Sequence, residues 1–76
     1  MDRMEYLKLC QINSIGVKKQ KVIFDNIYYY PCGYLMTFKN GDTIHTAVLE
    51  DLNEKSIIYA KLEKVMVCAN EKRMQM

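Results

Sequence analysis

The sequence predicts an α+β fold, in which an N-terminal helix is followed by a meandering antiparallel sheet of about four to six strands. Apolar residues recur at three-residue steps near the start, and the period changes to two from about residue 20. An Asn40-Gly41 pair between two apolar runs is typical of a tight β-hairpin. The 76 residues, 50% hydrophobic and 26% charged, have the composition of a single small globular domain covering residues 1–76.

The helix is expected over about residues 3–13. Asp2 can cap it, and Glu5, three residues later, completes a capping-box pattern that satisfies two free backbone donors. Gly16 is a suitable stop, because glycine adopts the left-handed conformation without steric cost. A short strand through residues 7–12 is the alternative, and the capping pattern favours the helix. The apolar positions expected to face the sheet are Met4, Tyr6, Leu7, Leu9 and Cys10.

Two turns and a distortion organise the β-rich part, expected over about residues 20–68. Asp25-Asn26 predicts a tight hairpin within residues 21–30. Pro31 cannot donate to a ladder, so it predicts a bulge or an edge position, and Gly33 fits the same distortion. Asn40-Gly41 predicts a two-residue turn of type I′, which fixes the register of the strands on either side. In that register Lys39 lies opposite Asp42, Phe38 opposite Thr43, Met36 opposite His45 and Tyr34 opposite Ala47.

Both faces of this second hairpin are apolar, which predicts cover on both sides. One face carries Tyr34, Met36, Phe38, His45, Ala47 and Leu49, and the other carries Leu35, Thr37, Ile44, Thr46 and Val48. We expect the core to contain Leu35, Ile44 and Val48 together with Ile23 and Ile57.

The C-terminal part predicts two more strands, at residues 57–60 and 65–68, with a bend or one helical turn at residues 61–64. Residues 70–76 are polar and charged, and we expect them to fray. A sheet of this kind could roll toward an SH3-like barrel, an expectation that rests on analogy between folds and supplies no function.

No catalytic constellation accompanies the single histidine, so we expect a protein that is not an enzyme and uses no cofactor. His45 is expected to be a half-buried histidine of the sheet that makes one hydrogen bond. Cys10, Cys32 and Cys68 with His45 would add up to a Cys₃His zinc set, but their spacing lacks the short Cys-x₂₋₄-Cys pairs of such sites. We therefore expect no metal.

Three cysteines, an odd number, argue against a disulfide framework, and no signal peptide or membrane span is visible. We expect a cytoplasmic protein that does not contact membranes. The abundance of lysine, isoleucine and asparagine fits a low-GC genome, and we expect a bacterial source.

Tyrosines are the strongest indication of a binding surface, because they give a large contact area at low entropic cost. The sequence predicts a small non-catalytic protein-interaction module, and its size fits a further interpretation as an accessory or inhibitor protein of a mobile element. Its partners would be an unidentified protein and a second copy of the chain in a homodimer. The candidate interface residues are Tyr28, Tyr30, Tyr34, Met36 and Phe38.

A nucleic-acid-binding module is the alternative. Lys18, Lys19 and Lys21 could bind phosphates beside Tyr28 and Tyr30, on which bases could stack. The net charge of +2 is weak for a dedicated nucleic-acid binder, and three lysines in a loop are more often simply solvated.

Overall fold

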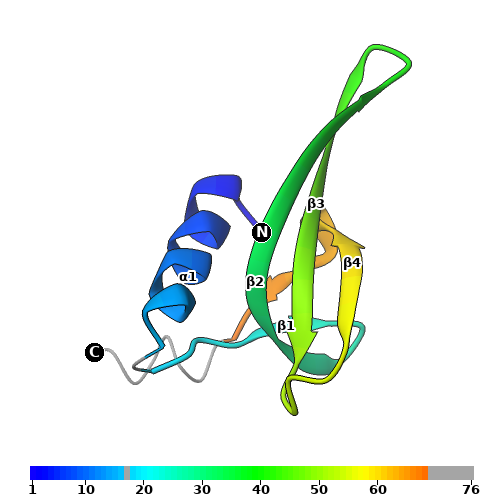
Figure 1. The fold of residues 1–76 in the computed structure, drawn as a ribbon. Helices are drawn as coiled ribbons and strands as arrows, with labels where there is room; N and C mark the ends of the chain where they lie inside the picture. Colours follow the sequence, from blue (N-terminus) through cyan, green and yellow to red (C-terminus); the bar gives the residue numbers. More distant parts are fainter. Residues whose placement is uncertain (17, 69–76) are drawn as a thin grey trace.

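A single helix packs against a five-stranded antiparallel sheet, which confirms the α+β class (Figure 1). The computed structural model describes residues 1–16 and 18–68, so the expected fraying of residues 70–76 lies outside the described residues. The elements are α1 (Arg3–Ile15), β1 (Val22–Phe24), β2 (Ile27–Lys39), β3 (Asp42–Asp51), β4 (Ile57–Lys61), the 3₁₀ helix η1 (Leu62–Lys64) and β5 (Met66–Val67). The strand order is β4-β3-β2-β1-β5.

Helix α1 begins at the predicted residue and is stopped by the predicted Gly16, but it runs to Ile15, two residues beyond the expected end. The Asp2 carboxylate accepts a hydrogen bond from the Glu5 backbone N–H at 3.2 Å, and Gly16 closes the helix with φ of 80°. The predicted buried stripe was partly wrong, because Met4 and Leu7 are exposed. The sheet is instead contacted by the side that carries Tyr6, Cys10 and Asn13.

Both predicted hairpins are confirmed. Asp25 and Asn26 have φ of 53° and 65°, so the first turn has two left-handed residues and pairs Phe24 with Ile27. The second turn places Lys39 opposite Asp42, and the whole predicted register of β2 and β3 follows from it.

The predicted bulge is also present, and it changes which side chains share a face. The β2–β3 register shifts between Pro31 and Gly33, so Cys32 is an extra residue in β2. Side chains alternate along a strand, and one inserted residue reverses the alternation. Tyr30, which pairs with Glu50 before the bulge, therefore lies on the opposite face from Tyr34, which pairs with Ala47 after it.

Side chains from α1 bind the backbone on both sides of the bulge. The Tyr6 hydroxyl lies 2.7 Å from the Gly33 carbonyl oxygen and 2.9 Å from that of Val48, so its proton is shared between them. The Asn13 amide donates to the Pro31 carbonyl at 3.0 Å. Asn13 also makes two hydrogen bonds with the backbone of Gln20. Its Nδ2 donates to the Gln20 carbonyl, and its Oδ1 accepts from the Gln20 N–H. These bonds attach the helix to the sheet at one defined place.

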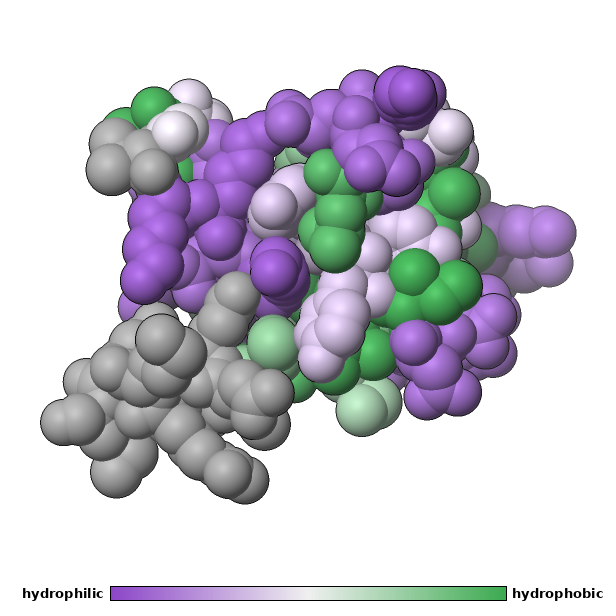
Figure 2. Space-filling view, turned by 90° about the horizontal axis from the view of Figure 1, so that it is seen from below, coloured by the Kyte–Doolittle hydropathy of each residue, from purple (hydrophilic) through white to green (hydrophobic). Residues whose placement is uncertain are grey.

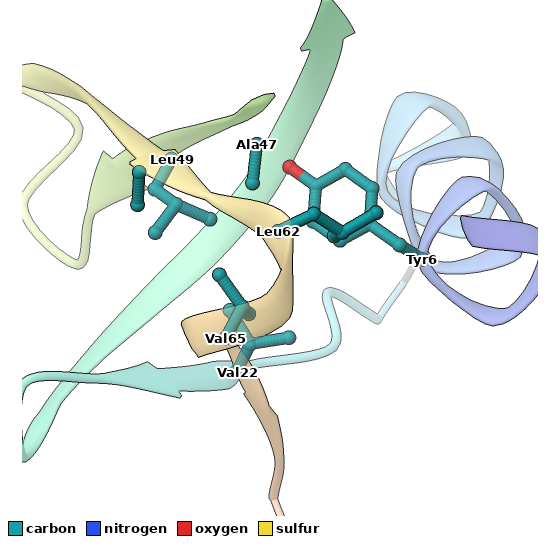
Figure 3. Close-up of a cluster of buried hydrophobic side chains, with 7 residues drawn as sticks. Tyr6, Val22, Ala47, Leu49, Leu62 and Val65 are labelled. Atoms are coloured by element: carbon teal, nitrogen blue, oxygen red, sulfur yellow. The ribbon is translucent and has the colours of Figure 1, made fainter. Parts of the chain in front are cut away.

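The hydrophobic core lies between α1 and one face of the sheet, with η1 closing its side (Figure 3). The expected core of Leu35, Ile44, Val48, Ile23 and Ile57 was wrong, because all five lie on the other face, where Leu35 and Ile57 are exposed. The helix covers the opposite face because Tyr6 and Asn13 bind it there. The buried core consists of Tyr6, Val22, Ala47, Leu49, Ala60, Leu62 and Val65.

Over the described residues the sheet is not closed into a barrel. In this part of the chain strand β4 pairs with β3 alone, and β5 pairs with β1 alone, through Val22–Val67 and Ile23–Met66. The two edge strands are consecutive in the chain, joined through η1, yet no pairing between them is present among residues 18–68. The expected SH3-like barrel is therefore replaced by an open sheet with α1 and η1 over one side.

Two leucines that differ in their face test the location of the core. Leu49 is fully buried in the core, on the face of the sheet that α1 covers, whereas Leu35 is 47% exposed on the other face. We expect Leu49→Ala to lower the free energy of unfolding by about 2–5 kcal/mol, as a cavity in a packed core does. The matched Leu35→Ala should lower it by less than about 1 kcal/mol, because the side chain is already half solvated. Urea unfolding of the two variants measures both values, and equal losses would contradict the assignment.

A second prediction concerns alkaline pH. Burial raises the pKa of the Tyr6 phenol far above its usual value, so the folded protein keeps a proton that the unfolded chain loses above about pH 10. Stability should be fully present below that pH and fall as the pH rises above it. Tyr6→Phe should cost about 1 kcal/mol at neutral pH and show a weaker loss above pH 10. Urea unfolding at a series of pH values measures the free energy of unfolding of both proteins. The same pH dependence in wild type and in Tyr6→Phe would contradict this role of Tyr6.

Candidate interaction surface

The face of the sheet turned away from α1, here called the outer face, is largely apolar and has no covering element among the described residues. Strand pairing assigns its side chains, because residues that pair across strands project to the same side. Exposed on it are Tyr28, Leu35, Ile57, Tyr59 and Met66, and Ile23, Tyr30, Ile44, Thr46 and Val48 are half-buried between them. The outer face is therefore a second hydrophobic surface that the fold leaves in contact with solvent.

Gly33 leaves the position beside Val48 on the outer face without a side chain. A Cβ placed on Gly33 would lie 3.3 Å from the Cβ of Val48, its partner on β3. Tyr59 pairs with Val48 from the other side. Figure 2, which views the molecule from below Figure 1, shows hydrophobic and weakly polar surface gathered between hydrophilic side chains.

The structure divides the five candidate interface residues into two groups. Tyr28 and Tyr30 lie on the outer face, before the bulge. Tyr34, Met36 and Phe38 lie after it, on the side that faces α1. The second group lies near the tip of the β2–β3 hairpin. We call residues 35–45 of this hairpin the arm, and Tyr34 lies at its base. This division was missed at the level of the sequence because the bulge was predicted but its one-residue shift was not carried into the alternation of side chains.

The predicted lysine loop does lie beside the predicted tyrosines. Lys19 Nζ is 5.2 Å from the ring centroid of Tyr30, and Lys21 Nζ is 5.9 Å from that of Tyr28. Lys19 also forms an ion pair with Glu54 at 2.7 Å, and this hydrogen bond raises the pKa of the Lys19 ammonium. Lys18 is exposed. Lys19 and Lys21 therefore lie over tyrosine rings, and Lys19 also pairs with an acidic side chain.

His45 is a half-buried sheet histidine with a hydrogen bond, as predicted, and the structure identifies the bond as one between its Nδ1 and the Tyr34 hydroxyl. The two rings are stacked at 5.9 Å between centroids. This pair fixes both side chains on the α1 side of the arm.

The three cysteines lie in different surroundings. Cys10 Sγ is 3.8 Å from the Gly33 carbonyl oxygen, and burial raises the pKa of its thiol. Burial and then the charge of Glu50 raise the pKa of the Cys32 thiol in the bulge, and Cys68 is buried. A raised pKa lowers the fraction of reactive thiolate at neutral pH. Within residues 1–16 and 18–68, no three histidine, cysteine or acidic side chains come together as metal ligands.

An open pocket of about 530 Å³ lies between the start of α1, the β3 side of the arm and η1. Its charged lining is mixed, with Asp2 and Glu63 against Arg3 and Lys61. Neither sign of charge dominates, so the pocket offers no clear preference for an anion or a cation.

No protein-family model, curated protein or solved structure matches this chain. None of the helices in the described part of the chain has the length and apolar character needed to cross a membrane.

Proposed function

We propose that this chain is a small non-catalytic protein-interaction module that binds a partner protein through the outer face. The observation that carries the proposal is the exposure of Leu35, Ile57 and Tyr59, which occupy three successive cross-strand rows of the outer face around the half-buried Val48. Soluble monomers rarely leave a large contiguous apolar surface uncovered, and such surfaces mark interaction sites.

The size of the outer face supports this proposal. A large side chain buries about 200 Å² when fully covered. The exposed side chains of the outer face are about half accessible and the half-buried ones about a fifth accessible. Together they offer on the order of 700 Å² of surface. A standard protein–protein interface takes about 800 Å² from each partner. The outer face thus has nearly the area that a specific partner needs.

Its composition also supports a protein partner. Tyr59 and Tyr28 are amphipathic aromatic residues of the kind that dominate binding energy. Lys61 lies at the margin of the face, on the edge strand β4, where it pairs with Thr46. Glu50 lies within the face, half-buried between Tyr30 and Ile57. The partner should therefore offer a largely apolar surface that also satisfies this carboxylate.

The nucleic-acid alternative has one observation in its favour, the placement of Lys19 and Lys21 beside Tyr30 and Tyr28. The same placement also weakens it, because the lysines lie over the rings on which bases would stack. A further observation against it is that Lys19 is already paired with Glu54. Counterion release by so few cations would give weak affinity at physiological salt.

The test compares two exposed residues changed in the same way. Tyr59 is 65% exposed on the outer face, and Ile15 is 70% exposed on α1, away from it. Wild type, Tyr59→Lys and Ile15→Lys are immobilised and exposed to lysate of the source cells, and the captured proteins are compared. We expect a protein captured by wild type and by Ile15→Lys whose yield falls at least tenfold with Tyr59→Lys, a loss of about 1.4 kcal/mol or more.

Equal capture by all three proteins would contradict the role of the outer face, provided that circular dichroism shows each variant folded. The added lysine also separates the two candidate functions. Tyr59→Lys should keep or strengthen binding to oligonucleotides, because it adds a cation. A retained oligonucleotide shift at low salt, with no protein captured by wild type, would favour the nucleic-acid module.

A further inference from the structure

Strand β2 has a long free edge in the arm, separate from the outer face. Strand β1 pairs only with residues 27–29 of β2, so the stretch after the bulge, residues 33–39, is paired on one side alone, with β3. Figure 1 shows the arm extending well past α1 and β4. Among the elements described, none pairs with this edge.

The turn determines which backbone groups of β2 point to the free edge. In a two-residue turn the Lys39 carbonyl faces the Asp42 N–H, so the backbone groups of Lys39 point toward β3. Groups alternate in direction along an antiparallel ladder. The N–H and C=O groups of Tyr34, Met36 and Phe38 therefore point outward, away from β3.

This edge lacks the usual protection along its length. Natural edge strands avoid association through charges, prolines or bulges. Here the bulge at Cys32 protects one end and Lys39 the other, and the residues between them carry no charge. Met36 and Phe38 are 47% and 74% exposed beside the free backbone groups.

We propose that a second copy of this chain pairs with the free edge of β2, giving a homodimer whose two-fold axis lies between the two copies of Met36. Tyr34 of one copy then lies opposite Phe38 of the other, and Met36 lies opposite Met36. All three are outward-pointing residues, so each N–H and C=O of the edge gains a partner across the axis. The two sheets join into one continuous sheet.

The register between the two copies follows from the ends of the regularly paired stretch of β2. Residues that lie opposite each other across a two-fold axis must belong to the same face of the sheet. The axis must therefore lie between the two copies of one residue, and not between two different neighbouring residues. The bulge at Cys32 and the turn at Asn40 limit the regular stretch to residues 33–39. Met36 is its midpoint, and the only position that pairs the whole stretch with itself.

Charge and composition favour a second copy as the occupant. In this register Lys39 lies opposite Gly33, so no two like charges meet, and the central pairs are aromatic or aliphatic. The other open edges are shorter: β4 has five residues and ends in Lys61, and β3 is free only over residues 42–45. The contact is small by the standard of specific interfaces, so we expect dissociation in the micromolar range.

The experiment uses the property that residue 36 faces itself. Sedimentation of wild type over a hundredfold dilution should show a mass that rises from 9.0 kDa toward twice that value. Met36→Lys and Met36→Glu should each stay monomeric, because like charges meet about 5.5 Å apart between Cα atoms. An equimolar mixture of the two variants should dimerise again, and this recovery should weaken with salt. Met66→Lys, at a 59% exposed methionine of the outer face, is the matched control and should dimerise as wild type does.

A wild type that stays at 9.0 kDa up to millimolar concentration would overturn the proposal, and so would dimerisation of Met36→Lys alone. Loss of the dimer in Met66→Lys but not in Met36→Lys would place self-association on the outer face instead. These outcomes are independent of the capture by Tyr59 variants, so the dimer and the partner-binding proposal can fail separately. Recovery in the mixture also shows that both variants are folded.

Discussion

The contact between the Tyr6 hydroxyl and the backbone at the Cys32 bulge is the interaction on which the rest of the structure depends. The phenol is buried, and its proton is shared between the carbonyls of Gly33 and Val48. A polar group in this position is favourable only with its hydrogen bonds made, so α1 has one place to attach. That place selects the face of the sheet that becomes the core, the face that carries Ala47 and Leu49.

The choice of face has two consequences for binding. The face left outside keeps Leu35, Tyr59 and their neighbours in solvent, and it supports the proposed partner site. The bulge also ends the regular part of β2, which leaves a regularly paired edge that is uncharged between the bulge and Lys39. The interaction surface and the proposed dimer edge are therefore products of the same local distortion.

The sequence predicted the features that depend on neighbours in the chain. The two turns, the Asp2 cap, the Gly16 stop, the bulge and the β2–β3 register are all encoded within a few residues. The core was wrong because the two faces of the second hairpin are equally apolar, so hydrophobic pattern cannot choose between them. The choice comes from Tyr6 and Asn13, polar contacts over long sequence separation that no local pattern reveals. The division of the tyrosines failed for a related reason, since the bulge was foreseen but its effect on the alternation of side chains was not followed through.

Nuclear Overhauser contacts from the Tyr6 ring test this account most directly, because they report which face α1 covers in solution. The account predicts contacts from the ring to the methyl groups of Ala47 and Leu62, beside which it lies (Figure 3). It predicts none to the methyl groups of Leu35 or Ile44, which project from the other side of the sheet. Contacts from Tyr6 to Leu35 and Ile44, with none to Ala47, would contradict the assignment of the core and of the outer face together.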